Sequence, residues 1–182
     1  GKPIGEFEVK VTRNDAGEAA PIGEDGEIWV RGYTVMLGYY KNEEATREAI
    51  NQDGWFKTGD LGHYDADGYL KITGRAKEMF IVGGSNAYPA EIERYLETHP
   101  KVGQAVVCGA PHERLGEICF AFIMPKDGER VEGGEIVDFC RGQIADYKVP
   151  RQVEIVDDFP RTSTNKIQRY ILQRDVADRF SV

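Results

Sequence analysis

Apolar and polar residues alternate with a period of two near the start of the chain. Phe7, Val9 and Val11 are separated by charged or hydroxyl side chains, and Ile28 and Val30 repeat the pattern. Such alternation predicts strands that bury one face. Glycines recur between and after these segments, at positions 17, 23, 26, 32 and 38. We therefore expect residues 1–75 to be rich in short β-strands.

Two local signals refine this first region. Asn42 can accept a hydrogen bond from the free N–H groups that open a helix, and the two glutamates after it suit the positive end of the helix dipole. A short helix is therefore predicted after Asn42. Asp67 and Gly68 form a dipeptide typical of hairpin turns, so the flanking residues should pair as strands. With much glycine and few large aliphatic residues, the region makes a poor independent core, and we expect it to be the edge of something larger.

From residue 76 the pattern changes to alternating strands and helices. Apolar residues predict strands at 78–82, 102–107, 118–124 and 152–156, and the middle two are apolar enough to be buried on at least one side. Apolar residues at helical spacing mark three helices: Ile92, Tyr95 and Leu96 after an opening Pro89; Ile136, Phe139, Cys140 and Ile144; and Ile167, Tyr170, Ile171 and Val176. Three helices on a small sheet predict an α+β domain over residues 76–182.

Composition excludes several classes of function. The chain has 31 acidic and 23 basic side chains and a formal net charge of −8, which argues against a nucleic acid as partner, because such binding needs a surplus of cations on one face. A run of about 18 uncharged apolar residues is missing from the sequence, so we expect no transmembrane segment. The first residues also lack the pattern of a secretion signal, and a cytoplasmic location is expected.

The three cysteines, Cys108, Cys119 and Cys140, suggest neither a disulfide framework nor a metal site. Their number is odd and none belongs to a C-x-x-C pair. We expect all three to be small, reduced core residues.

Candidate chemistry begins at Thr58, Gly59 and Asp60, which follow two aromatic residues. A carboxylate on a tight glycine turn could accept two hydroxyl protons at once, as recognition of a ribose requires. The alternative is a turn in which the Asp60 side chain holds its own backbone.

A second candidate runs from Arg75 to the glycine pair Gly83 and Gly84. Arg75 and Lys77 occupy alternate positions of a segment that we expect to be extended, so they could face one anionic ligand or lie at a boundary between two moving bodies. A strand edge protected by charge is the alternative. The glycine pair permits positive φ or close approach of a ligand to the backbone, although a simple turn is its commoner use.

The third candidate is the stretch 160–169, which gathers Arg161, Lys166 and Arg169 with several hydroxyl and amide side chains and no acid. This composition suits an anion site, but the glycines of a Walker phosphate loop are missing. A helix that begins near Lys166 or Ile167 would point free N–H groups at the loop and favour a phosphate or carboxylate. A solvated loop is the alternative.

Taken in order, these stretches resemble the adenylate-forming superfamily of acyl-CoA synthetases, nonribosomal peptide adenylation domains and luciferase. The matching motifs are GWFKTGDLG at 54–62, DGYL at 67–70, GRAKE at 74–78, GGSNAYPAEIE at 83–93, and PRT at 160–162 followed by KI at 166–167. The fourth and fifth motifs point toward acyl-CoA synthetases of the fatty or aryl acid type. The resemblance covers nearly the whole chain.

The resemblance implies an AMP-forming ligase that joins a small carboxylic acid to ATP and then transfers the acyl group to the thiol of coenzyme A. By motif, Asp60 would hold the ribose hydroxyls and Arg75 would help on the same sugar. Lys77 would be the hinge between two catalytic arrangements, and Gly83 and Gly84 would line the path of coenzyme A. Lys166 would bridge the carboxylate and the α-phosphate. Mg²⁺ would accompany ATP, with its ligands outside this sequence.

Two departures qualify the resemblance. Asn165 stands where the family usually has glycine before the catalytic lysine, although Asn tolerates left-handed backbone better than most residues. Motifs that the family keeps upstream, the phosphate loop and the acyl pocket, are missing. We therefore expect residues 1–75 to be the end of a large N-terminal domain whose remainder is the missing partner, residues 76–182 to be the mobile C-terminal domain, and the chain alone to be nearly inactive.

Two other hypotheses stay open. One is an adenylation domain that loads a carrier-protein thiol. The other is a stand-alone, non-catalytic lid that binds a separate partner chain.

Overall fold

The computed structural model describes residues 1–180. It divides into two compact units, Gly1–Lys77 and Glu78–Val182. None of the described helices is long and apolar enough to cross a membrane.

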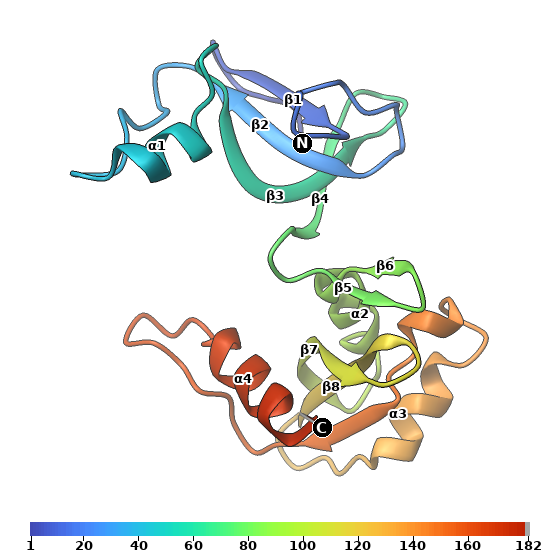
Figure 1. Ribbon diagram of the computed structural model, residues 1–182. Coiled ribbons are helices and arrows are strands. Elements are labelled where there is room, and N and C mark those ends of the chain that lie inside the picture. The colour runs from blue at the N-terminus through green and yellow to red at the C-terminus, as the bar shows by residue number, and fades with distance from the viewer. Residues whose placement is uncertain (181–182) are drawn as a thin grey trace. The chain divides into compact units, whose positions relative to one another are not determined.

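The first unit is an antiparallel sheet in which consecutive strands pair (Figure 1). Its strands are β1 (Glu8–Thr12), β2 (Gly26–Arg31), β3 (Phe56–Tyr64) and β4 (Leu70–Arg75), and helix α1 (Glu43–Ala49) lies between β2 and β3 in the chain. The predicted cap is confirmed, because the Ala45 N–H donates to Oδ1 of Asn42 at 3.0 Å. The predicted hairpin is also confirmed, since Tyr64 pairs with Leu70 across the turn that contains Gly68.

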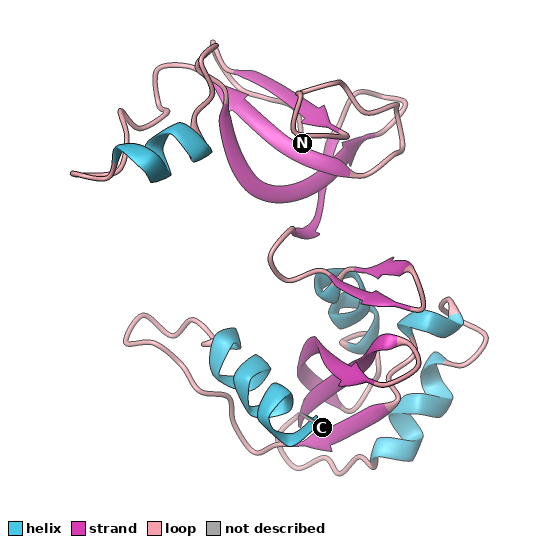
Figure 2. Cartoon of the chain, in the orientation of Figure 1, coloured by secondary structure: helices cyan, strands magenta, loops and turns pink. Residues whose placement is uncertain are grey.

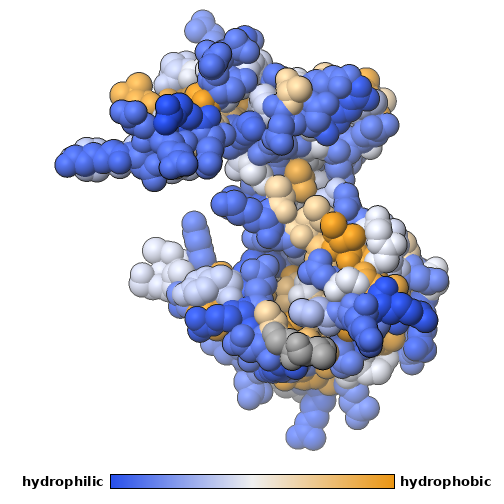
Figure 3. Space-filling model, viewed as in Figure 1, coloured by the Kyte–Doolittle hydropathy of each residue, from blue (hydrophilic) through white to orange (hydrophobic). Residues whose placement is uncertain are grey.

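The first unit has a sparse core. Among the described residues, its buried apolar side chains are those of Val11, Ile28 and Trp29, whereas Tyr33 and Leu37 are exposed. Figure 3 shows hydrophilic residues over most of the viewed face of each unit, interrupted by single apolar side chains. Most of the chain's apolar burial therefore lies in the second unit.

The second unit places three helices on a small sheet, which confirms the predicted α+β class (Figure 2). Its strands are β5 (Phe80–Val82), β6 (Ser85–Ala87), β7 (Val102–His112), β8 (Gly116–Pro125) and β9 (Gln152–Ile155); its helices are α2 (Pro89–Leu96), α3 (Gly133–Cys140), the short 3-10 helix Asp146–Lys148, and α4 (Arg169–Phe180). Strands β7 and β8 form a long antiparallel pair. Along its other edge, β8 pairs with β5 and, in parallel, with β9.

Both faces of the β7–β8 pair are buried. On one face Val107 and Cys119 pack with apolar residues of α2 and α3. On the other face Val106 and Phe120 pack with apolar residues of α4. Helices on both sides remove water from successive side chains of each strand, which explains why the two strands are almost continuously apolar rather than alternating.

Several predicted boundaries in the second unit are wrong, and the strand expected at 102–107 continues to His112. Helix α3 ends at Cys140, so Ile144 lies beyond it; Gly142, with φ of +69°, adopts a left-handed conformation that an α-helix cannot contain. The strand predicted at 78–82 begins only at Phe80, and the preceding residues form a turn.

The three cysteines are free and buried, as predicted. Loss of hydration on burial raises the pKa of the Cys108 thiol to about 12 and that of Cys140 to about 11. Burial also raises the pKa of Cys119 well above its ordinary value. None of the three therefore has the microenvironment of a reactive thiol.

We predict that these thiols make the fold less stable in alkali. Because their pKa values are higher in the folded chain than the ordinary value of 9.0, the unfolded chain releases their protons first as pH rises. The free energy of unfolding should therefore be unaffected by the thiols below about pH 8 and fall between about pH 9 and 12. Denaturant titrations across this range would measure the slope. A Cys108→Ala variant that kept the full slope would contradict the assignment.

Candidate functional site

Asp60 and Arg75 face each other on neighbouring strands. They are directly paired residues of β3 and β4, and Nε of Arg75 lies 3.0 Å from Oδ1 of Asp60. The Asp60 side chain is 31% exposed and that of Arg75 is 66% exposed. An ion pair this open to solvent contributes little to stability, so both groups are available to a polar ligand at small cost.

Residues 58–60, which were expected to form a tight glycine turn, instead lie within strand β3, at an irregularity in its pairing with β2. Oγ1 of Thr58 donates to the Ile28 carbonyl oxygen at 2.6 Å and accepts from the Asp60 N–H at 3.0 Å. Gly59 has a φ of +73°, a region that favours glycine. The Thr58 hydroxyl, rather than the Asp60 carboxylate, thus holds this backbone, and the carboxylate is left to Arg75.

Glu27 is a further residue at this irregularity of β3 that the sequence motifs did not indicate. Its Oε1 accepts from the Gly59 N–H at 3.0 Å, and its Oε2 accepts from the Trp29 indole N–H at 2.8 Å. Glu27 lies 32 residues before Gly59, so its role depends on the pairing of β2 with β3. The feature of the sequence that could have indicated Glu27 is the short predicted strand in which it alternates with apolar residues.

Lys77 does not lie on an extended segment with Arg75. Strand β4 ends at Arg75, and residues 76–78 form a turn, although the Ala76 N–H still donates to the Gly59 carbonyl oxygen of β3 at 2.9 Å. The expectation that Arg75 and Lys77 point the same way from one strand is therefore wrong. Lys77 is instead the last residue of the first unit, and it lines a pocket of about 410 Å³ with Thr58 and Gly59.

Gly83 and Gly84 form the turn of the β5–β6 hairpin. Their φ angles are +56° and +86°, the left-handed values that a two-residue hairpin turn requires at both positions. The Gly83 N–H donates to the Leu115 carbonyl oxygen at 2.9 Å. A Cβ atom added at Gly84 would meet nothing within 4 Å in this chain, so the turn needs glycine for its conformation and leaves its backbone open to a ligand.

Lys166 lies in a loop closed on itself. The loop begins and ends at a β-bridge between Arg161 and Ile167. Within it the Thr162 N–H donates to the Lys166 carbonyl oxygen at 2.8 Å, and the Lys166 N–H donates to Oγ1 of Thr162 at 3.1 Å. Asn165 has a φ of +64°, so it adopts the left-handed conformation that Asn tolerates better than most residues.

Helix α4 begins at Arg169, so the expectation of a helix that starts near Lys166 or Ile167 is wrong. The β-bridge at Ile167 holds that residue extended and delays the helix. Lys166 is therefore separated from the helix N-terminus, and its charge acts from the loop rather than together with free helical N–H groups.

The three cations of this stretch have different environments. Nη2 of Arg161 donates to Oε1 of Gln104 at 2.7 Å, and its Nε lies 3.4 Å from Asp158. Arg169 is paired with Glu93. Within residues 1–180, Lys166 is exposed and no carboxylate lies within ion-pair distance of its Nζ. Two of the three cations therefore stabilise the structure, and Lys166 is the one presented to a ligand.

Comparison with known proteins identifies the family. Residues 91–166 match the AMP-binding enzyme C-terminal domain. Over 182 residues the chain is 45% identical to YngI of Bacillus subtilis, named as an acyl-CoA synthetase, covering all of this chain and 33% of the relative. Over 166 residues it is 49% identical to the mitochondrial medium-chain acyl-CoA ligase ACSF2 of Danio rerio, covering 91% and 27%. The chain thus spans a third or less of these relatives.

Solved structures agree with this result. ATP-bound MatB from Rhodopseudomonas palustris has a TM-score of 0.93 and 35% identity, covering 100% of this chain and 36% of that one. The o-succinylbenzoate CoA synthetase MenE from Bacillus subtilis, in complex with the acyl-adenylate OSB-AMP, has a TM-score of 0.86 and 38% identity, covering 94% and 34%. The chain therefore carries the AMP-binding enzyme C-terminal domain, and over nearly its whole length it is similar to adenylate-forming enzymes.

Proposed function

We propose that the chain is the C-terminal part of an ATP-dependent acyl-CoA synthetase, which converts a carboxylic acid and ATP to acyl-AMP and pyrophosphate and then to an acyl-CoA thioester and AMP. The observation that carries the proposal is the Lys166 loop. Its backbone is closed by its own hydrogen bonds. The two nearby arginines, Arg161 and Arg169, are bound to Gln104 and Glu93. The ammonium of Lys166 is left as a cation for an anionic ligand.

Lys166 would act in the first half-reaction. Carboxylate and α-phosphate are both anions and must meet, and an ammonium group on a flexible stem can neutralise both while charge shifts between them. Asp60 would accept hydrogen bonds from the two ribose hydroxyls, since a carboxylate has acceptor capacity for both. Arg75, which already contacts that carboxylate, would orient it toward the same sugar. Mg²⁺ would enter with ATP, and its ligands are expected outside this chain.

Lys77, Gly83 and Gly84 would serve the second half-reaction. Lys77 would be the hinge between two domains. Residues 76–182 would form the mobile domain, which turns relative to residues 1–75, the end of a larger N-terminal domain. The division of compact units after Lys77 supports this assignment. Gly83 and Gly84 would line the pantetheine path of coenzyme A, because a hairpin turn without side chains leaves room for the thiol arm.

The reaction is tested in the longer enzyme that we propose contains this chain. We expect acid-dependent exchange of pyrophosphate into ATP, followed by AMP release on addition of coenzyme A. Medium-chain fatty acids are the first substrates to test, since relatives are named for them. AMP release with a carrier-protein thiol but not with coenzyme A would favour an adenylation domain. Failure of any carboxylic acid to support exchange would favour a non-catalytic lid.

The native mass and location of the protein complete the test. A native species of more than twice the 20.4 kDa of this chain is expected for a synthetase, whereas a species near that mass would favour the stand-alone module. We propose a cytoplasmic location. Fractionation would test it against the mitochondrial location in the names of the ACSF2 relatives.

A further inference from the structure

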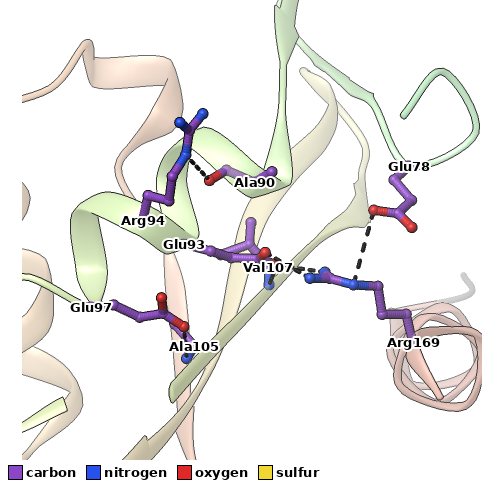
Figure 4. Close-up of polar contacts among 8 residues, drawn as sticks. All are labelled: Glu78, Ala90, Glu93, Arg94, Glu97, Ala105, Val107 and Arg169. Atoms are coloured by element: carbon purple, nitrogen blue, oxygen red, sulfur yellow. Dashed lines mark hydrogen bonds and ion pairs between the residues drawn. The ribbon is translucent and has the colours of Figure 1, made fainter. Parts of the chain in front are cut away.

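Arg169 lies between two carboxylates that come from distant parts of the second unit (Figure 4). Its Nη1 and Nη2 donate to Oε1 and Oε2 of Glu93 on α2, at 2.5 and 2.7 Å. Its Nε lies 3.9 Å from Oε2 of Glu78. The paired fork of Arg169 and Glu93 is the strongest geometry available to an ion pair, because two parallel hydrogen bonds fix both position and orientation.

Glu93 is a rigid partner because it is also bound to the sheet. Its side chain is 8% exposed, and its Oε1 accepts from the Val107 N–H on β7 at 2.8 Å. One turn later, at the residue that follows α2, Glu97 accepts from the Ala105 N–H of the same strand at 3.2 Å. The carboxylate that holds Arg169 is therefore fixed to the backbone of β7 at the edge of the sheet, as Figure 4 shows.

The loop of Lys166 is attached to β7 at both ends. At its start, Arg161 donates to Gln104. At its end, Arg169 binds Glu93, which binds Val107. Gln104 and Val107 both belong to β7, and Lys166 lies between the two attachments. The second partner of Arg169, Glu78, is the first residue of the second unit, next to the proposed hinge Lys77.

We propose that Arg169 is a positioning residue that holds the Lys166 loop at its C-terminal end, so that the lysine moves with the sheet and the segment after the hinge. This inference rests on the proposed function of Lys166. Without the Arg169 fork the end of the loop loses its polar attachment to β7 and keeps only the apolar packing of Ile167 and α4, so Lys166 samples positions away from the reacting atoms. A displacement of about 1 Å can cost a factor of ~10² in rate.

The test compares the two half-reactions in the longer enzyme. Arg169→Met should reduce acid-dependent pyrophosphate exchange by ~10²-fold and leave thioester formation from supplied acyl-adenylate within about twofold. Arg169→Lys keeps the charge beside Glu93 but not the paired hydrogen bonds. Its pyrophosphate exchange should therefore be about tenfold faster than that of Arg169→Met. The matched control is Arg179→Met, which removes the guanidinium that pairs with Glu154 and Asp175 at the other end of α4. It should leave both half-reactions within about twofold.

Amide hydrogen exchange on the 182-residue chain gives a readout that does not depend on activity. In Arg169→Met, the Thr162 and Gln168 amides, which donate to Lys166 and Pro160, should exchange at least about tenfold faster. Amides of β8 should keep their rates, which also shows that the variant folds. Arg179→Met should leave the Thr162 and Gln168 rates unchanged.

The outcomes separate this inference from the proposed function. Unchanged loop exchange in Arg169→Met overturns the inference. An equal loss of both half-reactions, or no rescue by Arg169→Lys, shows a merely structural role and also overturns it. If Lys166→Ala itself leaves pyrophosphate exchange intact, the proposed function of Lys166 fails, and the role of Arg169 in catalysis fails with it even when the loop loosens.

Discussion

Replacement of Lys166 by alanine is expected to reduce acid-dependent pyrophosphate exchange of the longer enzyme by about 10²- to 10³-fold, while thioester formation from supplied acyl-adenylate stays within about twofold. The first step brings two anions together, and loss of a preorganised charge from such a transition state commonly costs factors of about 10² to 10³. The second step starts from an acyl-adenylate, in which the carboxylate and the α-phosphate are already bonded to each other. Separate assays of the two steps measure the difference.

The structure makes this a test of charge rather than of folding. Lys166 is exposed, and the hydrogen bonds that close its loop involve its backbone and Thr162 rather than its ammonium group. Alanine can make the same backbone contacts. The control is Lys126→Ala, which removes another lysine of the second unit, whose Nζ donates to the Pro100 carbonyl oxygen. Pyrophosphate exchange that survives in Lys166→Ala would remove the catalytic assignment.

Replacement of Lys77 by proline is expected to separate the half-reactions in another way. Proline fixes φ near −65° and also restricts Ala76 before it. The turn after β4 would then hold one backbone conformation. If Lys77 is the hinge, one half-reaction should fall by about 10²-fold or more and the other should stay within about threefold.

The control at the same position is Lys77→Ala, which removes the ammonium group and leaves φ free. We expect both half-reactions of this variant to stay within about fivefold of the wild type. A proline variant in which both half-reactions fall equally would contradict a hinge. An alanine variant as impaired as the proline variant would assign the effect to the charge of Lys77 in its pocket instead.

Local features of the fold could be predicted because short stretches of sequence determine them. Asn42 caps a helix through an N–H group three residues away. Gly83 and Gly84 adopt left-handed backbone in a two-residue hairpin, and Pro89 opens a helix. In each case the side chain, or its absence, sets the conformation of its immediate neighbours. The burial of the cysteines followed in the same way from their apolar surroundings.

Errors occurred where a local pattern competed with a contact from elsewhere. The apolar residues at 167–176 predicted a helix from Ile167, but the bridge to Arg161 keeps Ile167 extended. The alternation of Arg75 and Lys77 predicted one strand, but a turn at residues 76–78 ends β4 at Arg75. Periodicity describes which face of an element is apolar, and it does not show where a tertiary contact ends that element.

The sequence by itself indicated the order of strands and helices except β6 and the short 3-10 helix, a residue at position 165 that tolerates left-handed backbone, and the set of polar residues from which a site could be built. Only the tertiary structure decided which of them are held and which are free. Arg161 finds Gln104 across 57 residues of sequence, and Arg169 finds Glu93 across 76. Because such pairs form only when the sheet and helices pack, a stretch with three similar cations became two structural attachments and one exposed lysine.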